Sequence, residues 1–134
     1  MNQIQRTALI TGSGRNIGRA AALILAKQGM NIVVNGSSNQ DACEIVANEV
    51  REIGPKAIVV MGDVGDINAL QDITSEAEKA FGRVDVLVNN AAVRPNSPFL
   101  ETDEDEWARI LDIDFHAARR LAKACLPAMI DNGW

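Results

Sequence analysis

Short runs of branched apolar residues alternate with helix-like segments along the whole chain. Because nearly continuous Val, Ile and Leu leave no polar face, each run predicts a strand buried on both sides. Such strands separated by helices are typical of a parallel sheet with right-handed crossovers. We therefore expect an α/β fold, a doubly wound parallel sheet in three layers (α/β/α). The predicted strands are Thr7–Thr11, Asn31–Asn35, Ala57–Met61 and Val84–Val88.

Glycines mark the predicted ends of the helices between these strands, since glycine tolerates the left-handed backbone that closes a helix. The helices are Ile17–Gln28, a segment ending at Ile53, and Ile67–Phe81, stopped by Gly29, Gly54 and Gly82.

After the fourth strand, a longer helix is expected to begin at Thr102, with Asp105 at capping-box spacing. The acidic run Glu101–Glu106 suits a helix N-terminus, where the helix dipole favours anions. Apolar side chains on this helix are expected to serve packing, and these are Trp107, Ile110, Leu111 and Phe115.

Composition narrows the class of ligand. The 134 residues are 47% hydrophobic, which fits one domain over residues 1–134. A net charge of -5 argues against nucleic acid or an anionic membrane as partner.

The chain starts MNQIQRTALI without an apolar h-region, and Cys43 and Cys125 are interpreted as buried reduced thiols, so we expect a cytoplasmic protein. With His116 as the single histidine, no metal site is expected.

The first strand runs directly into TGSGRNIG, residues 11–18. A G-x-G-x-x-G fingerprint requires glycine at position 17, which is Ile17. A Walker A loop requires the same glycine followed by Lys-Ser/Thr, where the chain has Gly18-Arg19. A bare glycine turn remains the alternative. However, a loop between a strand and a helix aims its amides and the helix dipole at one point, which suits a diphosphate. Asn16 can adopt the left-handed geometry that glycine would otherwise supply.

Four motifs in order give this chain a resemblance to the short-chain dehydrogenase/reductase family, especially its 3-oxoacyl-carrier-protein reductase-like members. They are TGSGRNIG, Asp63-Val64, Asn89-Asn90-Ala91-Ala92 and the helical stretch WARILDIDF. The family loop reads T-G-x-x-x-G-x-G, which explains the spacing, although Asn16 replaces its middle glycine and Ala92 the glycine of N-N-A-G. The resemblance implies a Rossmann-like fold, incomplete here at its C-terminal side.

The same resemblance implies a dinucleotide site. The loop residues would surround the diphosphate and the adenosine ribose, and Asp63 and Val64 would flank adenine. Asn90 would lie by the ribose, while Asn89 would stabilise the sheet. A solvated turn aspartate is the alternative for Asp63. The implied cofactor-binding residues are Gly12, Ser13, Gly14, Arg15, Ile17, Gly18, Ser37, Asp63, Val64, Asn90 and Ala91.

The end of the second strand bears on the choice of nicotinamide cofactor. An NAD site commonly places an acid there for the ribose 2′-hydroxyl, whereas a basic residue accommodates the 2′-phosphate of NADP. The sequence has Asn35-Gly36-Ser37-Ser38 and supplies Arg15 from the glycine loop, which favours NADP(H) over NAD(H). A solvated surface arginine is the alternative for Arg15.

The family reaction is hydride transfer between nicotinamide and a carbonyl or secondary alcohol, with a serine, a tyrosine and a lysine as catalytic residues. This chain has no tyrosine and reaches Trp134 before those residues would follow. We expect part of a longer reductase, inactive alone, since Val84–Val88 would otherwise leave an uncovered edge. A non-catalytic dinucleotide-binding module or sensor is the alternative.

Two further positions follow from the resemblance. Asp114 stands where the family has a proton-relay asparagine, with a capping or solvent-facing aspartate as the alternative. Arg94 lies in the family's substrate loop, or simply faces solvent. The family also implies a small-molecule carbonyl or alcohol substrate and a homo-oligomer, a dimer or tetramer formed partly through the long helix.

Overall fold

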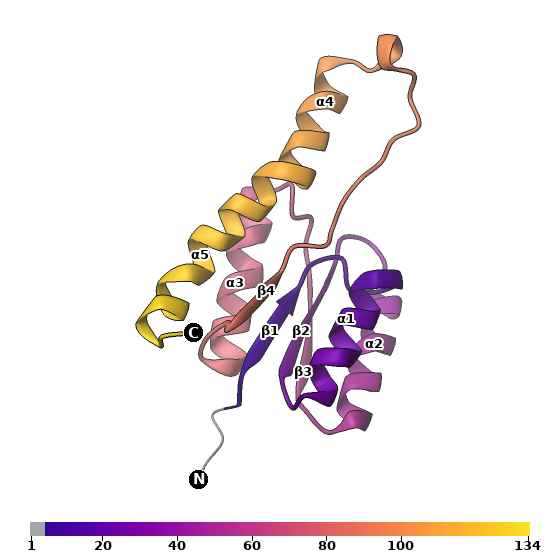
Figure 1. Cartoon of the computed structure of the whole chain (residues 1–134). Helices are drawn as coiled ribbons and strands as arrows, with labels where there is room; N and C mark the ends of the chain where they lie inside the picture. Colours follow the sequence, from indigo (N-terminus) through magenta and orange to yellow (C-terminus); the bar gives the residue numbers. More distant parts are fainter. Residues whose placement is uncertain (1–4) are drawn as a thin grey trace.

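A computed structural model describes residues 5–134 and shows one parallel sheet between helices (Figure 1). Residues 1–4, the start of the segment examined for an h-region, lie outside the described residues. The strands are β1 (Thr7–Ile10), β2 (Asn31–Gly36), β3 (Ala57–Met61) and β4 (Val86–Val88). The helices are α1 (Asn16–Lys27), α2 (Gln40–Ile53), α3 (Ile67–Phe81), α4 (Glu104–Leu111) and α5 (Ala117–Asp131), with a 3-10 turn η1 (Phe99–Glu101) and a π-helical turn η2 (Asp112–His116).

The strand order is β3-β2-β1-β4, and every pairing is parallel. This is the Rossmann-like order, with the switch point between β1 and β4. The prediction of a doubly wound, three-layer α/β fold is therefore confirmed. Within the described chain, β4 is an edge strand, paired only with β1.

Alternate residues of the central strands enter two separate hydrophobic cores, because successive side chains point to opposite faces of a sheet. Ile10 and Val34 pack under α1 and α2, whereas Leu9 and Val33 pack under α3 and α5. All four side chains are fully buried. Figure 1 shows these helix pairs on opposite sides of the sheet. Burial on both faces explains why the strands read as continuous apolar runs.

The predicted helix ends agree with the structure. Gly29, Gly54 and Gly82 follow α1, α2 and α3 with φ of 86°, 133° and 84°. Non-glycine side chains are strained in this region, so glycine ends each helix at low cost.

The fourth strand begins two residues later than predicted, at Val86 rather than Val84. The reason is Asp85, whose buried carboxylate accepts from the Thr7 amide (Oδ2, 2.9 Å) and pairs with Arg83 Nε (Oδ1, 2.6 Å). A side chain thus takes the place that a strand carbonyl would have had. This contact fixes the end of the sheet opposite the glycine loop.

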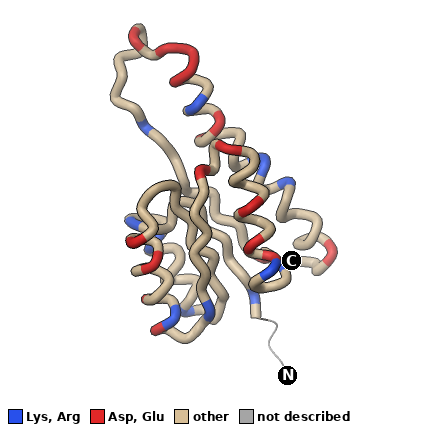
Figure 2. The backbone as a smooth tube through the Cα atoms, turned by 180° about the vertical axis from the view of Figure 1, so that it is seen from behind, with Lys and Arg blue, Asp and Glu red and all other residues tan. Residues whose placement is uncertain are grey.

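The long helix begins at Glu104 rather than Thr102, and its cap is Asp103, whose side chain accepts from the Glu106 amide. Glu104, Asp105 and Glu106 fill its first turn, as expected for a helix N-terminus. In Figure 2 this acidic cluster is visible around the start of α4.

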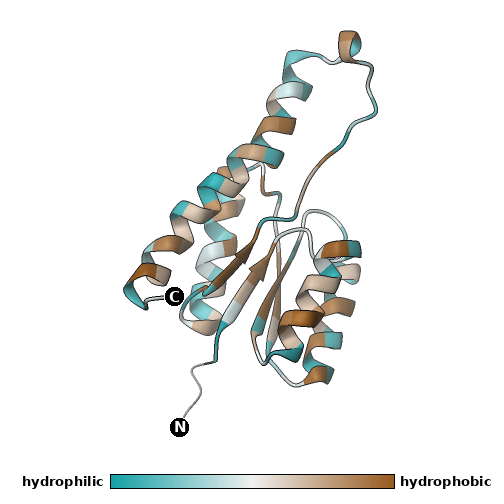
Figure 3. Cartoon of the chain, viewed as in Figure 1, coloured by the Kyte–Doolittle hydropathy of each residue, from teal (hydrophilic) through white to brown (hydrophobic). Residues whose placement is uncertain are grey.

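Three of the four apolar residues of this helix that were expected to serve packing lie outside the core of the described chain. Trp107, Leu111 and Phe115 are 38%, 47% and 62% exposed. The helices α4 and α5 are joined by η2 into one continuous helical rod. Hydrophobic residues occur all around this rod in Figure 3, but only one row of them faces the sheet. The buried residues of that row form one stripe, Ile113, Ala117, Leu121 and Cys125.

Cys43 and Cys125 are both free and buried, as predicted. Burial raises the pKa of the Cys125 thiol to about 11, with a smaller contribution from nearby Glu78, so this thiol stays protonated at neutral pH. In residues 5–134, no helix is long and apolar enough to cross a membrane.

Candidate functional site

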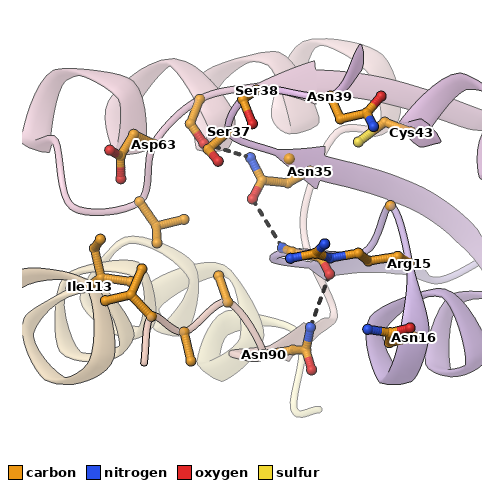
Figure 4. Close-up of a pocket in the computed structure, with 18 of the residues that line it drawn as sticks. Arg15, Asn16, Asn35, Ser37, Ser38, Asn39, Cys43, Asp63, Asn90 and Ile113 are labelled. Carbon is orange, nitrogen blue, oxygen red and sulfur yellow. Dashed lines mark hydrogen bonds between the residues drawn. The ribbon is translucent and has the colours of Figure 1, made fainter. Parts of the chain in front are cut away.

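An open pocket with a volume of about 580 Å³ lies at the carboxyl ends of the strands (Figure 4). Its walls come from the segments after all four strands and from α4 and η2. Sheets of this topology bind ligands at this edge, beside the switch point. The expected cofactor-binding residues that line it are Gly12, Gly14, Arg15, Ile17, Ser37, Asp63, Val64, Asn90 and Ala91.

The glycine loop needs small or left-handed residues at three positions. Asn16 has φ of 49° and is the one non-glycine residue with positive φ in the described chain, as the sequence predicted. At Gly12, with φ of 61°, a Cβ atom would approach the Ala91 Cα to 3.0 Å. At Gly18, a Cβ would lie 2.5 Å from the Gly12 carbonyl oxygen and 2.7 Å from Asn90 Nδ2. Gly18 therefore permits loop packing and lies behind the pocket wall.

Ser13 also lies behind the loop and does not line the pocket, and its place among the cofactor-binding residues stays a prediction. It is fully buried, and its hydroxyl donates to the Ile10 carbonyl at 2.7 Å. The same hydroxyl accepts from the Asn35 amide at 3.1 Å, and the Ser13 amide donates to the Asn35 carbonyl at 2.8 Å. Ser13 thus ties the loop to β2.

Asn35 is a residue that the sequence reading missed as part of the site. Its Nδ2 donates to the carbonyls of Val60 (3.0 Å) and Gly62 (3.1 Å), and its Oδ1 accepts from the Gly12 amide at 3.3 Å. One buried amide therefore joins the loops after β1 and β3. A polar residue at the end of an otherwise apolar strand was the available signal, because a buried polar group needs such partners.

Asn90 and Thr11 join β4 to the glycine loop. Asn90 Nδ2 donates to the carbonyls of Thr11 (3.0 Å) and Gly12 (3.1 Å). The Thr11 hydroxyl oxygen accepts from the amides of Asn90 and Ala91, each at 3.0 Å. Asn89 is exposed and has no side-chain hydrogen bond to another described residue, so the expectation that Asn89 stabilises the sheet is wrong. Asn90 makes those contacts instead.

Asp63 follows β3 and pairs with Arg109 of α4. Its Oδ2 lies 2.7 Å from Arg109 Nη2, and its Oδ1 accepts from the Gly65 amide at 2.9 Å. Burial opposes ionisation of this carboxyl, but the two hydrogen bonds and the guanidinium charge outweigh it, so the pKa of Asp63 lies below its usual value. Asp63 is therefore an anionic acceptor at the pocket edge, beside the buried Val64.

The pocket is basic although the chain is acidic. Arg15, Arg94 and Arg109 line it, and Asp63 is the single carboxylate among its lining residues. Arg15 and Arg94 are exposed and form no salt bridge with any residue in 5–134. Ser37 is also exposed, just after β2. Figure 4 shows Arg15 and Asn16 at one end of the pocket and Asp63 and Ile113 at the other.

Asp114 lies outside the pocket lining, in the π-helical turn η2. Its Oδ1 accepts from the Val93 amide at 2.8 Å, just beyond the Asn-Asn-Ala-Ala motif. In this structure Asp114 therefore holds the segment after β4 and does not cap a helix. Within the described residues, no group of three or more His, Cys, Asp or Glu side chains could hold a metal ion.

Known proteins resemble this chain in sequence and in fold. The family model for short chain dehydrogenases matches residues 6–134. L-rhamnose 1-dehydrogenase (NAD(P)(+)) of Sphingomonas sp. is 34% identical over 96% of this chain and 50% of its own length. A 3-oxoacyl-[acyl-carrier-protein] reductase of Staphylococcus epidermidis is 31% identical over 95% of this chain and 52% of its own length. The chain thus spans about half the length of these curated relatives.

Solved structures resemble the fold of this chain. L-sorbose reductase from Gluconobacter frateurii, complexed with NADPH and L-sorbose, superimposes with a TM-score of 0.91 at 31% identity, covering 96% of this chain and 49% of that chain. A metagenomic short-chain oxidoreductase in complex with NADP gives a TM-score of 0.88 at 30% identity, covering 95% of this chain and 57% of that chain. Fold, motifs and family match agree, and the chain belongs to the short-chain dehydrogenase family.

Proposed function

We propose that this chain is the cofactor-binding part of an NADP-dependent oxidoreductase that interconverts a carbonyl and a secondary alcohol. The observation that carries this proposal is the basic pocket above the glycine loop, at the switch point of the sheet. A loop that begins a helix and is held open by Gly12 and Asn16 suits a diphosphate. Bound there, the nicotinamide would supply or accept the hydride.

The preference for NADP rests on the end of β2 and on the glycine loop. The segment Asn35-Gly36-Ser37-Ser38 offers no acid for a ribose 2′-hydroxyl, and the side-chain amide of the buried Asn35 is bonded to the neighbouring loops. Arg15 and Ser37 both line the pocket, and Arg15 has no ion-pair partner in residues 5–134. A guanidinium so placed can form charge-assisted hydrogen bonds to a 2′-phosphate. Two similar solved structures hold NADP or NADPH, which supports the same choice.

The described residues supply binding and orientation but no proton donor for the reaction. The chain contains no tyrosine, and its single histidine, His116, does not line the pocket. We therefore expect the 134-residue chain alone to bind cofactor without turning over substrate. Asp114 would contribute by holding Val93 rather than by moving protons. The acid and base would come from residues that continue the protein to the length of its relatives.

The cellular compartment and the oligomeric state are part of the same proposal. Two free buried cysteines and a nicotinamide cofactor suit a reducing cytoplasm. Exposed apolar side chains, such as Phe115 of η2 and Ile130 of α5, suit a homodimer or homotetramer with a small-molecule substrate held in each subunit.

Calorimetric titration with NADPH and NADH tests the proposal on this chain. We expect NADPH to bind at least about tenfold more tightly, which corresponds to roughly one charge-assisted contact. Arg15→Ala should remove this difference. The matched control is Arg19→Ala, which removes the same charge from the exposed Arg19–Glu49 pair between α1 and α2, outside the pocket lining. Equal affinities of the unaltered chain for the two cofactors would contradict the NADP preference.

A second measurement separates an oxidoreductase from a dinucleotide-binding sensor. The protein extended beyond Trp134 to a Tyr-x-x-x-Lys motif should oxidise NADPH in the presence of one or more members of a ketone panel. Tight NADPH binding with no turnover on any ketone would favour the sensor.

A further inference from the structure

Arg109 forms a salt bridge with Asp63, the one salt bridge between two pocket residues within the described chain. It comes from α4, and its Nη2 lies 2.7 Å from the Asp63 carboxylate, 46 residues earlier in the chain. The other carboxylate oxygen accepts from the Gly65 amide at 2.9 Å. Two donors on different segments therefore fix both the position and the rotation of this carboxylate.

The approach of α4 to this point depends on Gly65. A Cβ atom at Gly65 would lie 2.9 Å from Ile113 Cγ1, 3.2 Å from Asp63 Oδ1 and 3.6 Å from Arg109 Nη1. Arg109 and Ile113 are four residues apart, so they lie on one face of the helix, and both line the pocket. The helical rod is thus seated on the Asp63–Gly65 turn, with its guanidinium against the carboxylate.

We propose that Arg109 is a positioning residue that holds the Asp63 carboxylate so that it accepts a hydrogen bond from the exocyclic amine of a bound adenine. This inference rests on the proposed function. An ionised carboxylate offers about four acceptor positions, and Arg109 and Gly65 occupy two of them. The remaining positions can accept from the ligand, provided that the carboxylate keeps its rotation. Without Arg109, Asp63 retains the Gly65 amide alone.

The contribution of this pair to folding should be small. The side chains of Arg109 and Asp63 are 58% and 33% exposed, and exposed ion pairs contribute little to stability. A variant that loses the guanidinium is therefore expected to fold, so that a change in binding can be assigned to the pocket.

The experiment compares binding of NADPH with binding of its hypoxanthine analogue, which lacks the exocyclic amine. The unaltered chain should favour NADPH by about tenfold, since a hydrogen bond to a charged group is lost. Arg109→Met should reduce this preference to about twofold or less, mainly by weakening NADPH, and Arg109→Lys should restore part of it. Asp63→Ala should abolish the preference, and adding Arg109→Met to Asp63→Ala should then change the ratio no further.

Arg119→Met is the matched control, since Arg119 is an exposed arginine of α5 outside the pocket. It should leave the preference for NADPH unchanged. An Arg109→Met chain that keeps the full preference, or that weakens both ligands equally, overturns the positioning role. If the unaltered chain binds neither NADPH nor NADH, the proposed function fails and this inference with it. If it binds NADPH without preference over the analogue, only this inference fails.

Discussion

The loop after β1 and the segment after β4 leave the same edge of the sheet but are held very differently. The loop, residues 11–18, is joined to β2 through Ser13 and to β4 through Thr11. By contrast, residues 94–101 are all exposed, and Leu100 is 93% exposed. In Figure 1 this segment extends beyond the sheet before it reaches α4. One described side-chain bond from it to α4 joins the Ser97 hydroxyl to Glu106.

The difference shows which part of the pocket the chain shapes by itself. The glycine loop is fixed by buried hydrogen bonds and by close contacts that exclude a side chain, so its geometry exists before any ligand binds. Residues 94–101 lack such contacts within the described chain. For the function that we propose, this arrangement would combine a preformed diphosphate site with a less constrained wall on the substrate side.

The strongest test of the preformed loop is Gly18→Ala. The added methyl would lie 2.5 Å from the Gly12 carbonyl oxygen, which is backbone and cannot rotate away. We expect roughly 3 kcal/mol of lost stability in urea unfolding, at the upper end for overpacking, together with loss of measurable NADPH binding. Gly14→Ala is the milder control, because its methyl meets the Cys43 thiol at 3.0 Å. A Gly18→Ala chain of unchanged stability would show that the loop can shift.

Asn90→Ala should have the next largest effect. It removes two hydrogen bonds, to the carbonyls of Thr11 and Gly12, and leaves partly buried groups without partners. A loss of about 2 kcal/mol is expected in urea unfolding. Asn89→Ala provides the matched control, since Asn89 is exposed, and should change stability by less than about 0.5 kcal/mol. Equal effects of the two substitutions would contradict the assignment of Asn90 as the link between β4 and the loop.

Asn16→Ala should cost less, about 1 kcal/mol, because alanine is strained at φ of 49°. Asn16→Gly relieves that strain and restores the family glycine, so it should be close to neutral in thermal unfolding and in NADPH affinity. If alanine and glycine behave alike, the left-handed conformation of residue 16 is not required.

Leu100→Ser should have the smallest effect. The side chain is almost fully exposed, so stability and NADPH affinity should stay within about 0.5 kcal/mol of the unaltered chain. A larger loss of stability would mean that contacts within the chain do hold residues 94–101, and the contrast with the glycine loop would then disappear.

The sequence predicted most of the fold because its signals are local. Apolar runs located the strands, the glycines at 29, 54 and 82 located helix ends, and Asn16 revealed the left-handed position in the loop. Hydrogen bonds between distant segments were not predictable in this way. The partners of Asn35 and Asn90 lie 23 to 79 residues away, and only the folded sheet brings them together.

The face of the last helix was mispredicted for a related reason. Apolar residues occur around much of this rod, so hydrophobicity does not decide which of them meets the sheet. Trp107 looked like a packing residue from its spacing, whereas Ile113 is the one that enters the core. Which apolar residue meets the sheet depends on the rotation of the rod about its own axis. A sequence pattern that assumes a regular helix cannot give that rotation when the helix is irregular.

That irregularity is the π-helical turn, in which the Ala117 amide donates to the Asp112 carbonyl five residues back. The buried stripe of α5 continues into this turn in steps of four residues as far as Ile113, and one further step of four reaches the exposed Arg109 at the pocket. In a regular α-helix each step of four residues drifts by about 40°, so the stripe would wind away from the sheet. The wider turn absorbs an extra residue and corrects this drift. Deleting one residue there would rotate Arg109 by about 100° relative to the core of α5 and away from Asp63, with both helices intact. The rotation of Arg109 toward Asp63, relative to the buried face of α5, is thus set by a single residue.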